Sequence, residues 1–259
     1  MAKTPNKVSP FARFERASPD IKPRIVASSY GEVGTGKTHF WLGAPAPIVV
    51  QTLDQGLEGV VEQYAKEKDI YLANYDLGAT IGASFTHAAA VEARDKFIED
   101  FETAIQSART IVWDRETDVF DLFYFAEFGT DDAFGAAGAK DWDKLKGKLR
   151  RMIAMAKASD INFGLIQGMR NEWVAKANKN TGAKAAAQSG NRIRKGMDDI
   201  EALVHIDLLH TRQNGEFSIE VKKSRGPGGT DVQDQTFEGL SFTDFALLVF
   251  PDTSEKDWA

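Results

Sequence analysis

Residues Gly31-Glu32-Val33-Gly34-Thr35-Gly36-Lys37-Thr38 match every position of the pattern G-x-x-x-x-G-K-[ST]. The short apolar segment Arg24-Ile25-Val26-Ala27-Ser28-Ser29 leads directly into them, and a helix-like stretch follows. Strand, glycine-rich loop and helix are the context that this pattern requires. Its glycines let successive backbone N–H groups turn inward around phosphate oxygens at the start of a helix. The stretch therefore predicts a phosphate-binding loop inside an α/β fold.

The chemistry of this loop predicts ATP and Mg²⁺ as cofactors. Lys37 is expected to reach the β- and γ-phosphates and Thr38 to ligate Mg²⁺. The residues predicted to bind the cofactor at the loop are Gly31, Glu32, Val33, Gly34, Thr35, Gly36, Lys37, Thr38 and His39. The alternative is a glycine-rich turn that binds nothing.

Length and composition restrict the class of protein. The chain has 259 residues, no cysteine and a formal net charge of -6. Its composition is that of a globular domain, which excludes collagen-like, mucin-like and wholly disordered chains. Without cysteine, disulfides, iron–sulfur clusters, thiolate zinc sites and cysteine nucleophiles are excluded. No signal-peptide stretch and no run of about 20 apolar residues is found. We therefore expect a cytoplasmic protein, in the host cytoplasm if phage-encoded, with no membrane partner.

Alternating apolar and amphipathic segments predict a mostly parallel central sheet flanked by helices. Further strands are predicted over residues 47–53, 109–114 and 161–167, and amphipathic helices over 86–108 and 145–156. Two β-rich runs, 203–210 and 216–223, are joined across Asn214-Gly215, which predicts a C-terminal antiparallel hairpin. The predicted organisation is an extended arm over residues 1–23, one domain over 24–250 and an acidic tail over 251–259.

Three carboxylates are candidates to bind the metal or to orient the attacking water beside the loop. Asp114 follows the strand-like Thr110-Ile111-Val112-Trp113, where a second metal-orienting carboxylate is expected. Asp54 and Glu58 follow the second strand, where either is a candidate to orient the attacking water. The alternative for these two residues is that they cap the next helix.

The order of these segments resembles the RecA-like ATPase core over about residues 22 to 245. In size and layout it is most similar to the phage RecA-like nucleotide-binding proteins that act in single-strand annealing or recombination. The resemblance implies that Gln167 senses the γ-phosphate and leads into a DNA-binding loop. It makes Asp54 the counterpart of the family's catalytic glutamate, and the shorter side chain puts fast hydrolysis in doubt. It also implies that Lys223 and Arg225 reach the ATP of a neighbouring subunit; the alternative is that they are solvated charges.

A basic segment follows Gln167. Between residues 170 and 196 there are seven basic residues and one acidic residue, which is a local charge of +6 in a chain whose formal net charge is -6. We expect a flexible loop in which cations bind phosphates and an aromatic ring stacks on bases. The residues predicted to bind DNA are Arg170, Trp173, Lys176, Lys179, Lys184, Arg192, Arg194 and Lys195. A solvated loop that binds nothing is the alternative.

The sequence thus predicts an ATP-dependent, single-stranded-DNA-binding RecA-like ATPase in phage-type homologous recombination or single-strand annealing. Its expected partners are single-stranded DNA, further copies of itself in a ring or filament, and a single-strand-binding or replication protein. One alternative is a nucleotide-switched interaction module, such as a helicase loader or assembly factor. Another is a P-loop kinase acting on a small molecule.

Overall fold

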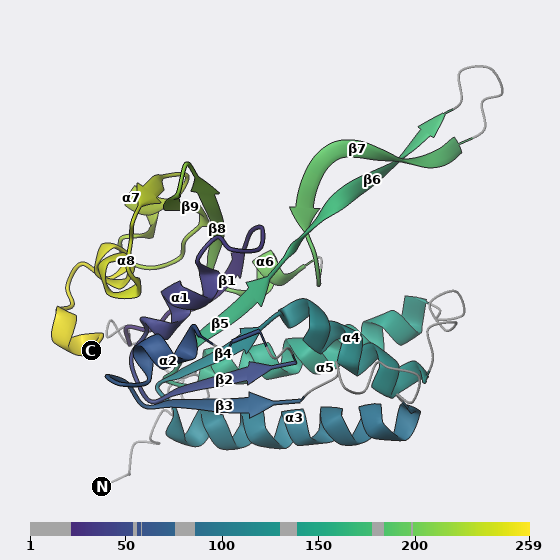
Figure 1. Ribbon diagram of the computed structural model, residues 1–259, viewed down its shortest axis with the longest axis horizontal. Helices are drawn as coiled ribbons and strands as arrows, with labels where there is room; N and C mark the ends of the chain where they lie inside the picture. Colours follow the sequence, from purple (N-terminus) through teal and green to yellow (C-terminus); the bar gives the residue numbers. More distant parts are fainter. Residues whose placement is uncertain are drawn as a thin grey trace, which may run out of the picture.

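The computed structural model describes residues 22–53, 56–57, 59–75, 86–129, 139–177, 184–197 and 199–259. Within these residues, helices cover both faces of an eight-stranded sheet, and a separate two-stranded antiparallel hairpin extends away from it (Figure 1). The strand order of the large sheet is β10-β9-β8-β1-β5-β4-β2-β3. The predicted α/β fold, with a mostly parallel sheet and a C-terminal antiparallel hairpin, is confirmed.

The parallel strands place their C-terminal ends at one edge of the sheet. Strand β1 pairs in parallel with β5 and β8, β5 with β4, β4 with β2, and β2 with β3. The strands cover Val26–Tyr30 (β1), Ile48–Thr52 (β2), Ile70–Asn74 (β3), Thr110–Asp114 (β4), Asn162–Gln167 (β5), Ile206–Gln213 (β8), Glu216–Lys223 (β9) and Thr236–Glu238 (β10). Residues that follow neighbouring strands therefore meet at this edge, as in other open parallel sheets.

One face of the sheet packs on three long helices. Successive strand residues point to opposite faces, so Trp113 of β4 belongs to this layer while Val112 belongs to the other. The Trp113 ring lies edge-on to Phe97, Phe101 and Phe163, with centroids 5.3, 5.4 and 5.1 Å away. The helices of this layer are α3 (His87–Ser107), α4 (Glu116–Phe128) and α5 (Ala139–Ala158), with the short α6 (Ile200–Leu203) beside them. These aromatic contacts fix α3 against the centre of the sheet.

The opposite face is covered by shorter helices. Trp41 is fully buried, and its indole N–H donates to the Ser29 hydroxyl, 2.9 Å away, so α1 is held against β1. The helices of this layer are α1 (Lys37–Leu42), α2 (Val61–Tyr64), α7 (Gly229–Val232) and α8 (Phe242–Val249). None of the helices in the described ranges has the length and apolar character needed to cross a membrane.

Residues 251–259, predicted as an acidic tail, pack on this second layer. They include a 3-10 helix over Glu255–Asp257. Trp258 is 1% exposed, its ring contacts Phe242 and Phe250, and its N–H donates to the Thr253 hydroxyl. The burial of one large ring thus attaches the segment to the domain. Residues 1–21 of the predicted arm lie outside the described residues.

The prediction of a loop after Gln167 is wrong for the described part of that basic segment, which forms two strands. Residues Met169–Ala177 (β6) and Lys184–Arg194 (β7) pair as an antiparallel hairpin, with a register shift between Asn171 and Trp173. Figure 1 shows it rising from the end of β5 beyond the sheet. The strands are rich in Ala and also contain Asn and Gly, and all three have low intrinsic preference for strands, so the composition indicated a loop. Backbone pairing between the two segments overrides that preference.

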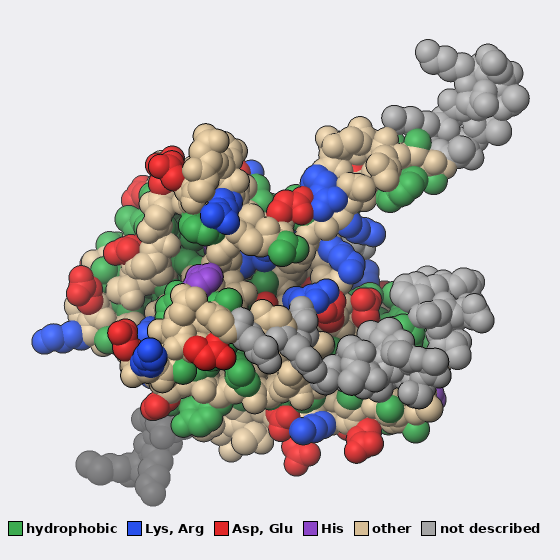
Figure 2. Space-filling model, viewed as in Figure 1, with side chains coloured by type: hydrophobic (Ala, Val, Ile, Leu, Met, Phe, Trp, Pro, Cys, Tyr) green, Lys and Arg blue, Asp and Glu red, His purple; other side chains and the backbone are tan. Residues whose placement is uncertain are grey.

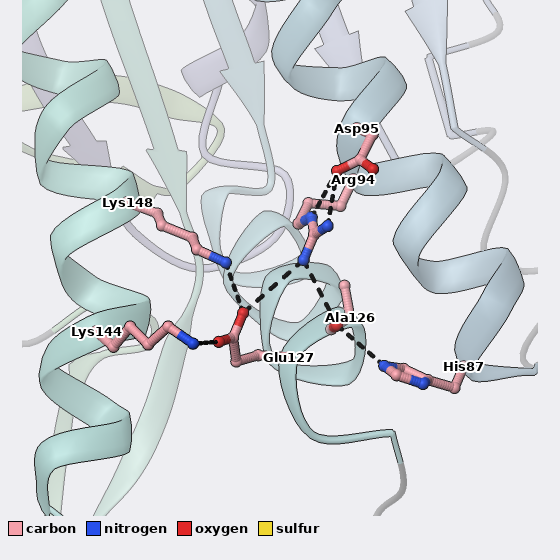
Figure 3. Close-up of polar contacts among 7 residues, drawn as sticks. All are labelled: His87, Arg94, Asp95, Ala126, Glu127, Lys144 and Lys148. Atoms are coloured by element: carbon pink, nitrogen blue, oxygen red, sulfur yellow. Dashed lines mark hydrogen bonds and ion pairs between the residues drawn. The ribbon is translucent and has the colours of Figure 1, made fainter.

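A polar cluster ties the three long helices together (Figure 3). Glu127 of α4 is bound by Lys144 and Lys148, one turn apart on α5. Arg94 of α3 lies 3.8 Å from the same carboxylate and donates to the Ala126 carbonyl. Lys144 and Lys148 lower the pKa of Glu127 to about 2, the hydrogen bond from Lys144 contributing most. Glu127 is therefore an anionic link between α4 and α5, and Arg94 extends the cluster to α3.

We expect Glu127→Gln to lower the unfolding free energy by about 1 kcal/mol at pH 7, because its partners are partly solvated lysines. The pKa of Glu127 is below its ordinary 4.5 in the folded protein, so this stabilisation is present above pH 4.5 and is lost as the pH falls toward 2. Urea unfolding from pH 7 to pH 3 measures it. The exposed Glu99→Gln on α3 serves as the control, and a difference independent of pH would contradict the assignment.

Candidate functional site

A pocket of 490 Å³ lies where β1, β4 and β5 end. The loop of residues 31–38 forms one wall, and the start of α4 and the base of hairpin β6–β7 form the others. The residues that line it are Gly31, Glu32, Val33, Gly34, Lys37, Thr38, Gly56, Leu57, Val60, Asp114, Arg115, Thr117, Asp118, Ile166, Gln167, Gly168, Met169, Arg192 and Lys195. The structure thus brings the predicted loop, Asp114 and Gln167 to one pocket.

The loop is held close to β8 because residue 31 has no side chain. A Cβ atom on Gly31 would lie 2.2 Å from the carbonyl oxygen of His210. Inside the loop, the Lys37 ammonium donates to the carbonyl oxygens of Gly31 and Glu32, at 3.0 and 2.7 Å. Burial lowers the pKa of Lys37, while Asp114 and Glu32 oppose that shift. Lys37 is therefore a partly desolvated cation enclosed by a curved backbone.

Asp114 and Thr38, the predicted metal ligands, are two of the oxygen-bearing residues that line the pocket. Asp114 is the last residue of β4, is 7% exposed, and lines the pocket with Thr38. Mg²⁺ is bound in proteins by one or two carboxylates together with substrate phosphates and water, rather than by a protein cage. In the described part of the chain, no three His, Asp or Glu residues cluster as a cage would require. These residues therefore fit a magnesium ion shared with a phosphate ligand.

Gln167 ends β5 with its side chain hydrogen-bonded inside the protein. Its Oε1 accepts from the Ser28 hydroxyl, 2.9 Å away, and its Nε2 donates to Glu116 Oε2 at 2.7 Å. The residue lines the pocket although it is fully buried. Its role as a γ-phosphate sensor stays a prediction; the geometry shows that movement of Gln167 would break a hydrogen bond to α4.

Glu116 is a buried carboxyl group that the sequence did not single out. It is 1% exposed at the start of α4, and a Cβ atom on Gly196 would lie 2.2 Å from its Oε2. Gly196, with φ of +110°, lies just after β7, so Glu116 connects the end of β5 to the base of the hairpin. Its only sequence signal was an acidic residue near a helix start, which is common on any helix.

Burial raises the pKa of Glu116 to about 7, against hydrogen bonds from Gln167 and Met197 that lower it. The folded protein therefore binds a proton between pH 4.5 and 7 that the unfolded chain releases, and stability falls as the pH rises through this window. We expect Glu116→Gln to gain up to about 3 kcal/mol over the wild type between pH 5 and pH 8. Denaturant unfolding at both pH values measures this. Glu102→Gln, an exposed change on α3, is the control, and a constant difference would be contrary to the prediction.

The base of the hairpin is bound to the domain by two arginines of β7. Arg192 donates to both carboxylate oxygens of Glu32, at 2.7 and 2.8 Å. Arg194 pairs with Asp207 of β8, which is 1% exposed, and its guanidinium lies 4.1 Å from the centroid of the Tyr30 ring. The Arg194 side chain is itself only 14% exposed. Both were predicted to bind DNA; in this structure they bind the loop and the sheet.

The other predicted DNA-binding residues lie on or beside the hairpin. Arg170 and Trp173 are exposed on β6, Trp173 by 60%. Lys195 follows β7 and lines the pocket. Lys176 and Lys184 lie within the strands of the hairpin.

Three of the predicted residues, Asp54, Glu58 and Lys179, lie outside the described residues. Gly56 and Leu57, which lie in sequence between Asp54 and Glu58, line the pocket.

Lys223 and Arg225 do not reach the pocket of their own chain. Lys223 ends β9 and pairs in register with Asp207, near the start of β8, so it lies at the sheet edge opposite the loop. Its ammonium donates to the carbonyl oxygens of Val204 and Glu201. Arg225 lines a different pocket of 290 Å³ with Arg24 and His205. A contact with a nucleotide would require a second subunit.

An aromatic cavity of 420 Å³ borders the other side of the loop. His39 and Tyr64 lie together in its wall, with Nδ1 and the phenol oxygen 3.2 Å apart. The half-exposed Phe217 of β9 also lines the cavity and lies against Gly36, where an added Cβ atom would be 3.1 Å from its ring. Thr35 and Gly36 line this cavity, whereas Gly34 and Lys37 line the polar pocket. The loop therefore contributes residues to both cavities.

No family model matches this sequence, and no curated protein matches it. Solved structures with some likeness include the RadB recombinase, with a TM-score of 0.46 and 10% identity over 84% of this chain and 87% of that one. A KaiC-like protein from the hyperthermophilic archaeon Pyrococcus horikoshii has a TM-score of 0.38 and 13% identity, over 83% of each chain. The flagellar accessory protein FlaH from Methanocaldococcus jannaschii has 0.36 and 8%, over 78% of this chain and 79% of that one. Likeness at this level does not determine function.

Proposed function

We propose that this chain is a RecA-like P-loop ATPase that binds ATP with Mg²⁺ in the 490 Å³ pocket and single-stranded DNA on hairpin β6–β7. The observation that carries the proposal is the meeting of Lys37, Thr38 and Asp114 in one pocket at the end of the parallel strands. A partly desolvated ammonium, a hydroxyl and a buried carboxylate are the groups that a magnesium–triphosphate complex requires.

The two cavities beside the loop suit the two ends of a nucleotide. The triphosphate would lie inside the loop, where Lys37 now donates to backbone carbonyls. The base would enter the aromatic cavity, which His39, Tyr64 and Phe217 line. Burial of a flat ring against aromatic side chains is favourable, so this cavity would supply affinity for a nucleobase. Mg²⁺ would be held by Thr38 and Asp114 and would neutralise charge on the phosphates.

Hydrolysis needs a group that orients water toward the γ-phosphate. We assign this role to Asp54, with Glu58 as the alternative. Support comes from Gly56 and Leu57, which line the pocket and lie in sequence between the two carboxylates. Gln167 stands at the pocket wall and links it, through Glu116, to the hairpin.

The hairpin is the part of the chain that suits DNA. It carries Arg170, Lys176, Lys184 and the exposed Trp173 on a ribbon that projects from the domain (Figure 2 shows basic side chains along its base). Exposed aromatic rings stack on unpaired bases, and nearby cations bind the backbone. Phage-type recombination or single-strand annealing is the role that would use such a surface. Assembly into a ring or filament would bring Lys223 and Arg225 to a neighbour's nucleotide, and a single-strand-binding or replication protein would be a further partner.

Lys37→Ala should abolish ATP binding and hydrolysis, because the phosphate pocket loses its enclosed cation. Lys66→Ala, an exposed lysine after α2, should leave both unchanged. Isothermal titration with ATP and Mg²⁺, and phosphate release with and without single-stranded DNA, measure the two activities. The proposed function predicts DNA-stimulated hydrolysis by the wild type. A wild-type protein that neither binds DNA nor is stimulated by it would refute the DNA-dependent part, and DNA binding unaffected by Lys37→Ala or nucleotide would favour an interaction module.

Trp173→Ala should weaken single-stranded DNA binding about tenfold, since a stacked base contributes roughly 1–3 kcal/mol. Tyr71→Ala is the matched control: its ring is 59% exposed on edge strand β3, at the end of the sheet order far from β1. Fluorescence anisotropy with a labelled oligonucleotide measures the affinity over a salt titration. Equal affinity of the Trp173 variant and the wild type at all salt concentrations would show that this ring does not stack on DNA.

A further inference from the structure

Arg192 is the cation of the hairpin that reaches the phosphate pocket. It lines the pocket with Lys37 of the loop and Lys195. Its guanidinium is oriented from the β6 side, because Nη1 donates to the Asn171 side-chain oxygen at 2.8 Å and Nη2 to the Met169 carbonyl at 3.2 Å. The remaining edge of the fork, formed by Nε and Nη2, points to Glu32. Arg192 is therefore held by its own hairpin while it contacts the loop.

The partner of that edge is a carboxylate on the loop itself. Glu32 is the second residue of the phosphate-binding stretch, and its two oxygens receive Nε and Nη2 at 2.7 and 2.8 Å. The Glu32 and Arg192 side chains are 51% and 42% exposed. An ion pair this exposed contributes little net stabilisation, so exchanging one partner for another costs little. The same guanidinium edge binds phosphate and carboxylate in the same bidentate geometry.

We propose that Arg192 recognises the terminal phosphate of the bound nucleoside triphosphate, which displaces Glu32 from the Nε/Nη2 edge of its guanidinium. The proposal rests on the proposed function, because it requires a nucleotide in the 490 Å³ pocket. Arg192 would then distinguish ATP from ADP from within the same chain. Since Arg192 is a residue of β7, the terminal phosphate would also hold the base of the hairpin against the loop.

Competition between Glu32 and the phosphate for Arg192 predicts a result that charge repulsion alone does not. Removing Glu32 relieves Arg192 of its partner, so a triphosphate should bind more tightly. If Glu32 acted only by repelling phosphates, the gain would appear with or without Arg192. If Glu32 acts by occupying Arg192, the gain should vanish when Arg192 is absent. The double variant therefore separates the two explanations.

The experiment measures the affinity of a non-hydrolysable ATP analogue and of ADP, each with Mg²⁺, by isothermal titration calorimetry. Arg192→Gln should weaken the analogue about tenfold and ADP less than about twofold, the effect of losing a charge-assisted contact to one phosphate. Glu32→Gln should strengthen the analogue about threefold or more and leave ADP nearly unchanged. The double variant should match Arg192→Gln. Arg151→Gln, an exposed arginine of α5, is the control and should bind both ligands as the wild type does.

Three results would overturn the inference. Equal weakening of ADP and the analogue by Arg192→Gln would show a structural role at the loop. No effect on either ligand would show that Arg192 does not touch the nucleotide. A gain from Glu32→Gln that persists in the double variant would show repulsion alone. All three leave the proposed function standing, whereas a wild-type protein that binds neither nucleotide would overturn both. The gain from Glu32→Gln cannot result from misfolding, so it tests the inference even if Arg192→Gln disturbs the hairpin.

Discussion

The parallel pairing of β1 with β5 is the constraint on which the candidate site depends. Their register places Tyr30, the residue before the loop, level with Gln167. Strand β4 pairs on the other side of β5, which places Asp114 at the same edge. Both faces of these strands are buried, so a shift by one residue would exchange the two apolar layers and is strongly disfavoured. The loop of residues 31–38, Asp114 and the base of the hairpin are neighbours because of this register.

Much of this arrangement could be predicted from the sequence, because its central strands have strong local signals. Apolar runs between turn residues located β1, β2, β4 and β5, and the spacing of Phe97 and Phe101 located α3. The weaker strand β3 was missed, since Tyr71 and Leu72 are exposed at the edge of the sheet and give no buried run. The first run of the C-terminal hairpin was placed about three residues early, because Leu203 belongs to α6. Local patterns detect burial, and elements at the boundary of the sheet have little of it.

The features of the site that the sequence did not reveal arise from contacts between distant segments. Arg192 and Glu32 are 160 positions apart, and Gln167 and Glu116 are 51 apart. Neither pair has a spacing that marks it, because the distance along the chain between two strands varies with the helix that joins them. The aromatic cavity likewise combines residues of α1, α2 and β9. Such contacts follow from the topology of the sheet, which local sequence patterns do not specify.

The charge of the hairpin has a different meaning once its partners are known. Of the seven basic residues counted in the segment, Arg192 is paired with Glu32 and Arg194 with the buried Asp207. Removing one member of a buried pair leaves an uncompensated charge. Arg194 and Asp207 therefore stabilise each other's burial and fix the base of the hairpin to β8. The local charge of +6 therefore overstates the number of cations that are available to bind a DNA backbone. Binding to this ribbon would rely on fewer cations and more on Trp173, with a shallower dependence on salt than the composition suggests. Arg194 thus fixes the base of the hairpin to the sheet, while Arg192 lines the 490 Å³ pocket. In the proposed function this arrangement would link a change at the nucleotide phosphates to DNA bound on the hairpin.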